Sequence, residues 1–425
     1  MRTLARVICY IVLLGCASHG SAQALAVDRS LKPALRPSAA AVSVPVQASA
    51  PNPSFSRWVD SFRRRALAQG IRADVFDTAF RTVRYNPDIV ARDRNQSEFT
   101  KQIWDYLSTA VSPTRVANGQ AALRGYARTL AQIEARYGVD KEIVAAIWGL
   151  ESAYGAVRGN TPTLNALASL AFDPRRSAFF EAQLIAALKI LQSRNVTLGG
   201  LRGSWAGAMG HTQFMPLAYL EHAQDFNRDG RRDIWSDDPT DALASTAAYL
   251  AANGWTKGQP WGMEVRLPRG FDYGLTTEQV KKPSQFWSRL GVRAANGQPI
   301  PRYRGTSILL PAGHEGPAFL IFPNFQVLET YNTADAYVIG VGHLADRIAG
   351  GGAIRAAWPR GDRALSFGEK QEMQRRLLAK GFDPKGVDGI IGPRTIAAVQ
   401  AYQKSIGWVP DGYVSARVLE RLRTR

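Results

Sequence analysis

The chain has 425 residues, of which 45% are hydrophobic and 21% are charged. These are the proportions of a folded globular protein, and they exclude a disordered, collagen-like or multi-span membrane chain. Lys and Arg number 53 against 35 Asp and Glu, a formal net charge of +18. Such a chain is attracted to polyanions, a class that includes nucleic acid, acidic lipid and anionic cell-wall polymer. The length suits about two or three domains.

The first 24 residues have the pattern of a secretory signal peptide. Arg2 and Arg6 precede a short apolar run, and Ala22-Gln23-Ala24 supplies a small-residue cleavage pattern. The apolar run is shorter than the roughly 18 residues that cross a bilayer. Export counts against an intracellular nucleic-acid target and places the chain in the cell envelope. Both cysteines lie in this segment, so a chain cut after it forms no disulfide of its own.

Cys16 gives the same segment a second interpretation. Leu13-Leu14-Gly15-Cys16 resembles a bacterial lipobox, in which the cysteine is lipidated and becomes the new N-terminus, although Leu14 is untypical before the glycine. Two locations therefore stay open for this chain in a Gram-negative bacterium. It is either a soluble periplasmic protein or an outer-membrane lipoprotein.

Composition divides the rest of the chain into four parts. Residues 25–54, rich in Ala, Ser, Pro and Val, are expected to be a flexible linker. Helical periodicity predicts a mainly α domain over 55–352, with a small β-containing insert between Trp261 and Phe325. A Gly- and Pro-bearing linker, 353–364, leads to a helical domain, 365–425, of a size that folds alone. No internal repeat is evident, and the fold class is mainly α (α+β).

A short helix is predicted from Asp140, its expected N-cap, to a stop at Gly155. Glu151 lies on the apolar face of this helix, because Ile147 and Trp148 precede it by four and three residues. Desolvation and the helix C-terminus would both raise the pKa of Glu151. A carboxylic acid that stays protonated near neutral pH can protonate a leaving oxygen. The alternative is a structural glutamate that bonds backbone or a buried arginine.

Three motifs, at residues 148–152, 204–216 and 331–337, occur in this order along the chain. The second packs small residues, an amide and aromatics together, as expected where backbone approaches a bulky polar ligand. Together they resemble the membrane-bound lytic murein transglycosylase B family, over about residues 55–348. The resemblance implies a lysozyme-like domain that cleaves the MurNAc–GlcNAc β-1,4 bond of peptidoglycan without water. The product would carry a 1,6-anhydro-MurNAc end.

In that family one glutamate supplies both the acid and the base, and the resemblance gives this role to Glu151. A positioned C6 hydroxyl then attacks the anomeric carbon in place of water. A standard glycosidase needs two carboxylates, and within the three motifs only Asp335 offers a second. The resemblance also implies that Ser204, Gln213 and Asn332 hydrogen-bond the sugar or developing charge and that Tyr337 orients or polarises Glu151. The residues that it implies to line the groove are Phe214, Met209, Tyr249, Tyr331 and Tyr106. Burial in the core is the alternative for the apolar members of this set.

Residues 225–234 read Asp-Phe-Asn-Arg-Asp-Gly-Arg-Arg-Asp-Ile, the opening of an EF-hand calcium loop. The loop departs from the pattern at position eight, where Arg232 stands, and at position twelve, where Ser236 replaces the bidentate glutamate. The closing carboxylate would come from Asp241 or Asp237. Related enzymes bind calcium in a similar loop, and the resemblance favours Asp241. The alternative is a turn whose side chains cap their own backbone. The candidates for a structural calcium ion are Asp225, Asn227, Asp229, Arg231 and Asp241.

Residues 366–422 resemble the small peptidoglycan-binding domain of three helices. The match rests on a first helix with Gln371 and Gln374 and on turns rich in Asp-Gly and Gly-Pro. A second domain for the same polymer supports the first resemblance, because tethering raises the local concentration of binding sites along the wall.

Two rivals share the scaffold. A hydrolytic muramidase would leave a reducing MurNAc end, and a non-catalytic peptidoglycan-binding scaffold would release nothing. The five histidines form no His-Glu-x-x-His pair, no Gly-x-Ser-x-Gly elbow is present, and no motif reads nucleic acid. We therefore expect a monomeric enzyme that needs no cofactor for its chemistry, that binds peptidoglycan glycan strands and not nucleic acid, and that has an outer-membrane anchor if Cys16 is lipidated.

Overall fold

The computed structural model describes residues 52–94 and 102–424. The expected signal peptide, with Cys16, and most of the expected first linker lie outside these residues. Helix α1 begins at Pro53, two residues before the start expected from periodicity, because the Asn52 side chain accepts hydrogen bonds from the first turn. Among the described residues, no helix combines the length and the apolar composition that crossing a membrane requires.

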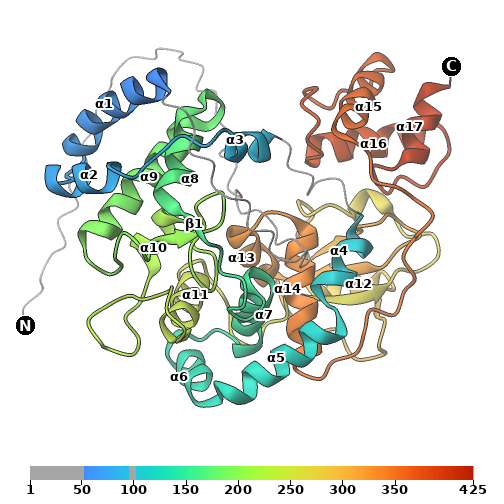
Figure 1. The fold of residues 1–425 in the computed structure, drawn as a ribbon. Coiled ribbons are helices and arrows are strands. Elements are labelled where there is room, and N and C mark those ends of the chain that lie inside the picture. The colour runs from blue at the N-terminus through green and yellow to red at the C-terminus, as the bar shows by residue number, and fades with distance from the viewer. Residues whose placement is uncertain (1–51, 95–101, 425) are drawn as a thin grey trace, which may run out of the picture.

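The predicted mainly α fold is confirmed, and Figure 1 shows helices α1, α2 and α8 to α10 at one end of the molecule. The insert and the C-terminal helices lie at the opposite end. In the larger domain the helices are α1 Pro53–Ala68, α2 Ala73–Phe80, α3 Pro87–Arg94, α4 Ile103–Ala110, α5 Pro113–Gly125, α6 Ala127–Tyr137, α7 Lys141–Ser152, α8 Thr163–Phe172, α9 Ser177–Gln192, α10 Pro216–His222, α11 Thr240–Ala252, α13 Pro323–Tyr331 and α14 Asp335–Ile348. A short antiparallel pair, β1 Thr161–Pro162 with β2 Arg202–Gly203, follows α7 and precedes the second motif.

Helix α7 is central, because it packs against α14, α5, α11 and α6. Its ends differ from the sequence prediction. Asp140 occupies the N-cap position but makes no cap hydrogen bond; its carboxylate accepts from Trp255 Nε1 at 2.9 Å and from Gly258 N. The helix stops before Gly155, at Ala153, which has φ 51° and ψ 50°, and Tyr154 follows with φ 58°.

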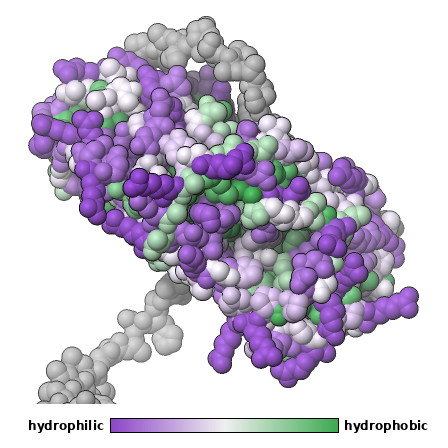
Figure 2. All heavy atoms as spheres, turned by 90° about the horizontal axis from the view of Figure 1, so that it is seen from below, coloured by the Kyte–Doolittle hydropathy of each residue, from purple (hydrophilic) through white to green (hydrophobic). Residues whose placement is uncertain are grey.

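The predicted β-containing insert is an antiparallel sheet of four strands in the order β4-β3-β6-β5. The strands are β3 Gly262–Arg266, β4 Arg293–Ala294, β5 Ser307–Leu309 and β6 Ala318–Ile321, with the one-turn helix η3 Tyr273–Leu275 and helix α12 Ser284–Arg289 between them. Trp287 of α12 is fully buried in a small core of the insert's own. Seen from below, hydrophilic side chains cover most of both ends of the molecule, and hydrophobic ones gather near its middle (Figure 2).

The C-terminal module contains three helices, α15 Phe367–Ala379, α16 Pro393–Ser405 and α17 Ala416–Arg423. Helix α15 begins with a capping box, in which Ser366 and Glu369 each bond the other's backbone N–H. A separate cluster of buried side chains, centred on Leu377, Val399 and Leu419, forms the core of this module.

The module holds two turns that are built alike, although the sequence shows no repeat. In each half, a helix glutamine holds an Asp-Gly turn by the same pair of hydrogen bonds. The sequence conceals this because 14 residues separate the glutamine from the aspartate in the first half and eight in the second. The pairs are Gln374 with Asp388-Gly389, and Gln403 with Asp411-Gly412.

Candidate active site

Glu151 lies in the last turn of α7, where the apolar environment predicted from the sequence is present. Ten consecutive residues of the helix, up to Ser152, are buried, and Glu151 itself is 3% exposed. Tyr337, in the first turn of α14, donates a hydrogen bond to Glu151 Oε1 at 2.8 Å. Burial, together with the nearby Glu151 carboxylate, raises the pKa of Tyr337 well above its ordinary value. The phenol therefore remains a proton donor to the carboxylate throughout the neutral range.

Tyr331 joins the second and third motifs. Its hydroxyl donates to Thr212 O at 2.6 Å, and its ring lies parallel to that of Tyr337, with centroids 6.5 Å apart. The structure thus brings one residue from each of the three motifs to the end of α7.

The side chains of Gln213 and Ser204 both form hydrogen bonds with the backbone of the second motif. Gln213 has φ 53°, is 4% exposed, and donates from Nε2 to Arg158 O and Gly210 O. Both of its N–H donors are therefore used within the protein. Ser204 Oγ accepts from the backbone N–H of Ala206 and Ala208, which closes a tight turn.

The aromatic and apolar residues expected to line a groove differ in how far they are buried. Met209 and Phe214 are 0% and 1% exposed, which matches the alternative that they belong to the core. Tyr249 is half-buried, with its ring against Phe214 and its hydroxyl bonded to Thr330 O.

Asn332 and Tyr106 both contact α14 or the residues that lead into it. Asn332 is 5% exposed, and its Oδ1 accepts from Ala334 N at 3.0 Å, so it shapes the entry to α14. The Tyr106 ring lies against Gly340, one turn beyond Tyr337; a Cβ on that glycine would be 3.0 Å from the ring. The glycine lets α4 approach α14 closely.

His211 is a contact that sequence reasoning missed. Trp148 Nε1 donates to His211 Nδ1 at 3.0 Å, and His211 Nε2 lies 2.7 Å from Ser236 O, which together assign a neutral ring with its proton on Nε2. Burial lowers the pKa of His211, in agreement with that state. Ser152 Oγ also donates to His211 O, and His211 N to Ile234 O. His211 therefore links helix α7 to the candidate calcium loop, beside a cavity of about 330 Å³.

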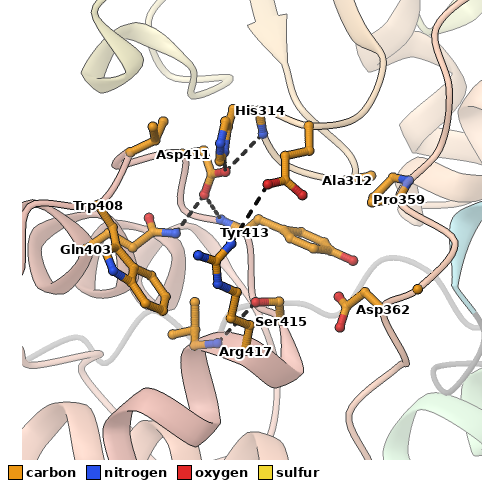
Figure 3. Close-up of a pocket in the computed structure, with 14 residues that line it drawn as sticks. Ala312, His314, Pro359, Asp362, Gln403, Trp408, Asp411, Tyr413, Ser415 and Arg417 are labelled. Atoms are coloured by element: carbon orange, nitrogen blue, oxygen red, sulfur yellow. Dashed lines mark hydrogen bonds and ion pairs between the residues drawn. The ribbon is translucent and has the colours of Figure 1, made fainter.

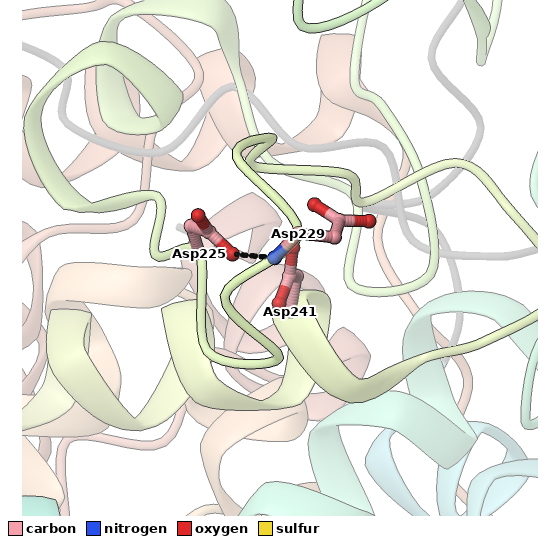
Figure 4. A group of neighbouring side chains, drawn as sticks. All are labelled: Asp225, Asp229 and Asp241. Carbon is pink, nitrogen blue, oxygen red and sulfur yellow. Dashed lines mark hydrogen bonds between the residues drawn. The ribbon is translucent and has the colours of Figure 1, made fainter.

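The candidate calcium residues Asp225, Asp229 and Asp241 come together (Figure 4), with carboxylate oxygens within 4.8 Å of one another. Asp237, the other residue considered for closing the loop, instead bonds Arg158 at 2.7 Å and points to solvent. The structure thus favours Asp241 as the closing carboxylate.

Side chains of the loop also accept hydrogen bonds from the loop's own backbone, as the alternative of a self-capping turn predicts. Asp241, 1% exposed at the start of α11, accepts from Phe226 N and Asn227 N with Oδ1 and from Asp233 N with Oδ2. Burial raises the pKa of Asp241 although these donors favour the charged form. Arg231 N donates to Asp229.

Arg232, which departs from the pattern at position eight, is turned out of the loop. Its guanidinium lies 5.3 Å from the centroid of the Tyr219 ring, and its backbone oxygen accepts from the Tyr219 hydroxyl. The three aspartates that face one another offer only carboxylate oxygens, the donor set that suits a hard divalent cation.

The structure contains a second cluster of carboxylates that the sequence did not predict. Glu278, Glu329 and Asp335 hold carboxylate oxygens within 4.8 Å of one another. Burial, and then the neighbouring negative charges, raise the pKa of Glu329 to about 8 and that of Asp335 to about 7. Asp335, the one alternative partner for Glu151 within the motifs, is thus a member of this cluster.

This cluster makes stability depend on pH in a definite direction. Because the pKa values of Glu329 and Asp335 are higher in the folded chain, the folded state holds protons that the unfolded state releases above about pH 4. The free energy of unfolding should therefore fall as pH rises from 5 to 8. Glu329→Gln should flatten that fall and stabilise the chain at pH 8 by on the order of 1 kcal/mol. Urea unfolding at both pH values, with exposed Glu221→Gln as control, checks this; identical pH dependence in parent and Glu329→Gln would contradict it.

Comparison with known proteins is in agreement with the three motifs. Residues 54–346 match the family described as the transglycosylase SLT domain, and residues 369–422 match a peptidoglycan binding domain. Membrane-bound lytic murein transglycosylase B of Escherichia coli (strain K12) is 34% identical over 255 residues, or 57% of this chain. The match spans 66% of that protein, just under two thirds of its length.

Solved structures extend the comparison across both domains. SltB3 from Pseudomonas aeruginosa, in complex with NAG-anhNAM-pentapeptide, is 51% identical with a TM-score of 0.85, over 88% of this chain and 100% of that one. Escherichia coli Slt35 in complex with calcium is 29% identical with a TM-score of 0.60, over 70% of this chain and 93% of that one. The chain therefore belongs to the lytic transglycosylase family of the SLT domain and carries a peptidoglycan-binding domain at its C-terminal end.

Proposed function

We propose that this chain cleaves the MurNAc–GlcNAc β-1,4 bond of peptidoglycan and leaves 1,6-anhydro-MurNAc ends, in cell-wall remodelling and turnover. The observation that carries the proposal is the buried hydrogen bond between Tyr337 and Glu151, at the point where the three motifs meet. The SltB3 structures, one with an anhydro sugar and one with NAG-NAM-pentapeptide, support the substrate class.

In the proposed reaction Glu151 is both acid and base. It gives its proton to the glycosidic oxygen, so the GlcNAc hydroxyl departs as the bond to the MurNAc anomeric carbon breaks. The MurNAc C6 hydroxyl then bonds to that carbon, and its proton returns to Glu151. No water is consumed, and a hydroxyl already on the same sugar has a high effective molarity over water. The cycle starts from the protonated form of Glu151, the state predicted from the sequence.

The remaining motif residues would bind the sugar, within the limits that their contacts set. Gln213 would act through its carbonyl oxygen, because both of its N–H groups bond the protein. Ser204 would donate from its hydroxyl, and Asn332 would contribute a polar amide to the same sugar. Tyr249 and Tyr106, which are half-buried, would supply ring surface, while Met209, Phe214 and Tyr331 support them from the core.

Tyr337→Phe should lower kcat by about tenfold with little change in KM, because one hydrogen bond to a charged group is lost beside the reacting proton. The measurement is initial-rate kinetics on a soluble glycan substrate. Tyr303→Phe, in which a phenol that lies in the insert loses its hydroxyl, is the matched control. A Tyr337→Phe enzyme with a raised KM and unchanged kcat would show that the hydroxyl serves binding instead.

We further propose that Asp225, Asn227, Asp229, Asp241 and the Arg231 backbone carbonyl hold a structural calcium ion. The calcium complex of Slt35 supports this, as does the oxygen-only donor set. Calcium at millimolar concentration should raise the melting temperature by about 5 °C if the free ion is in about hundredfold excess over its dissociation constant. The double variant Asp225→Asn/Asp229→Asn should lose that shift in differential scanning fluorimetry. An equal shift in the double variant would place the ion elsewhere.

The proposed location is the cell envelope, on the periplasmic side. Support comes from the export pattern of the first 24 residues and from the membrane-bound relative of Escherichia coli. Signal peptidase cleavage and lipidation at Cys16 differ in the mass of the mature N-terminal peptide, which distinguishes the two.

Product identity tests the proposed activity. Purified peptidoglycan is incubated with the full chain, and the released muropeptides are identified by mass spectrometry. Ends that lack one water relative to reducing MurNAc support the transglycosylase. Hydrated reducing ends would make the chain a muramidase, and binding without release would make it a scaffold.

A further inference from the structure

One of the two repeated turns of the C-terminal module docks the module onto the insert (Figure 3). Asp411 uses its two oxygens differently. Oδ1 accepts from Gln403 Nε2 at 2.7 Å and from Tyr413 N at 3.0 Å, within the module. Oδ2 accepts from His314 N at 2.9 Å and from His314 Nδ1 at 2.6 Å, across the boundary. One oxygen therefore builds the turn, and the other holds a peptide segment of the insert.

The turn at Asp388 has the same hydrogen bonds within the module as the turn at Asp411. Asp388 Oδ1 accepts from Gln374 Nε2 and from Ile390 N, each at 2.9 Å. Gly389 N donates to Gln374 Oε1 at 2.7 Å. The matching bond in the docked turn, from Gly412 N to its glutamine, measures 2.8 Å. Within residues 52–94 and 102–424, nothing donates a hydrogen bond to Asp388 Oδ2, the oxygen whose counterpart holds the insert.

The helix residue beneath each turn is also equivalent. A Cβ on Gly389, where φ is 74°, would lie 2.5 Å from the Phe367 ring, and a Cβ on Gly412, where φ is 73°, would lie 2.6 Å from Ile396. Phe367 and Ile396 each precede their glutamine by seven residues. The two turns are thus built alike down to the side chain that packs under the glycine.

Exposed apolar side chains form a rim beside the turn at Asp388. Ile390, which takes the place of Tyr413, is 65% exposed, Phe367 is 59% exposed and Val387 is 36% exposed. Tyr413 itself is half-buried, and its hydroxyl contacts Gln102 of the larger domain at 3.4 Å. Three large exposed apolar side chains at the turn that carries this acceptor oxygen form a surface suited to a ligand that offers an N–H group beside aliphatic groups.

We propose that Asp388, with the rim of Phe367, Val387 and Ile390, binds the peptide stem of peptidoglycan, Oδ2 accepting from a stem N–H or ammonium group. The choice of a peptide ligand follows from the turn at Asp411. There the equivalent oxygen binds a polypeptide segment that offers a backbone N–H and a side-chain N–H, both from His314. Stem alanines supply the aliphatic groups for the rim. The proposal rests on the proposed function, since it identifies which part of the same polymer the C-terminal module binds.

The carboxylate is in the right state for this contact. Partial burial opposes ionisation, but the hydrogen bonds from Gln374 and from the Ile390 backbone outweigh it and lower the pKa of Asp388. The acceptor oxygen therefore stays charged at neutral pH, and charge-assisted hydrogen bonds are about twice as strong as neutral ones.

The test uses the full chain carrying Glu151→Gln, so that binding is measured without cleavage. Affinity for insoluble peptidoglycan is determined by sedimentation. Asp388→Asn keeps the Oδ1 acceptor that builds the turn and replaces Oδ2 by a donor, so we expect about tenfold weaker binding. Ile390→Ser should also weaken binding, and its exposure makes it harmless to folding. Asp383→Asn, which changes an exposed aspartate of the same module that pairs with Lys385, is the matched control and should bind as the parent does.

A second substrate separates the peptide from the glycan. On glycan strands from which an amidase has removed the stems, the parent and Asp388→Asn should bind alike. Equal weakening on stripped strands would assign the contact to sugar and overturn the proposal. So would unchanged binding of Asp388→Asn and Ile390→Ser to intact peptidoglycan. Because cleavage is scored separately, by anhydro ends from the chain with Glu151 intact, failure of the binding site and failure of the proposed activity give different results.

Discussion

Replacing Glu151 by glutamine should lower the release of 1,6-anhydro muropeptides at least about 10³-fold, within the range that one positioned acid/base contributes. Glutamine matches the shape of glutamic acid and can still accept from Tyr337, so the buried pair can stay in place. What is lost is the proton that the glycosidic oxygen needs and the base that receives the C6 proton. Both halves of the reaction fail together, which is why the expected effect exceeds that of any binding residue. Quantitative mass spectrometry of released muropeptides measures it.

Glu142→Gln is the matched control, because this glutamate lies in the first turn of the same helix and pairs with Lys141 at the surface. It should release products at the parent's rate. If Glu151→Gln retained more than about a tenth of the activity, a second carboxylate would have to supply the proton, and Asp335 would be the first to replace.

The second large effect concerns folding. Asp241→Ala should lower the free energy of unfolding by about 3–5 kcal/mol, because three backbone N–H groups lose their buried acceptor at once. The loss should appear in urea unfolding carried out with a chelator present, so that it cannot reflect a missing ion. Calcium should not restore stability to this variant, since the closing carboxylate is absent.

Asp229→Ala provides the comparison for this experiment. Asp229 is exposed and accepts one backbone hydrogen bond, from Arg231 N, so its removal should cost less than about 1 kcal/mol without calcium. Equal losses in the two variants would mean that the loop's charge, and not the acceptor role of Asp241, sets its stability.

The local features of the site could be predicted from the sequence, because they depend on neighbours along the chain. Residue spacing alone placed Glu151 on the apolar face of a short helix, and composition located the insert and the C-terminal module. The buried neighbourhood of α7 follows from the same pattern. The raised pKa of Glu151 and the roles of the motif residues stay predictions.

Contacts between distant segments could not be predicted from residue spacing. Tyr337 and Glu151 are separated by 186 residues, and Trp148 and His211 by 63. Their meeting depends on how the helices pack. Only the family resemblance pointed to the first pair, and nothing pointed to the second. Asp140 shows a local prediction that tertiary structure overrides. Aspartate favours an N-cap hydrogen bond, but here its carboxylate accepts from the Trp255 indole instead.

The backbone immediately after Glu151 has a consequence for evolution of the chain. Ala153 and Tyr154 both adopt left-handed backbone angles, each about 1 kcal/mol unfavourable for a residue with a side chain. The Tyr154 hydroxyl is tied to Arg115 O, and its ring covers Gly149, so the rest of the domain enforces this turn. Glycine at position 153 would relieve the strain and loosen the end of the helix. The stability of the fold and the fixed placement of the Glu151 side chain therefore make opposite demands on residue 153, so a substitution selected for one should cost the other.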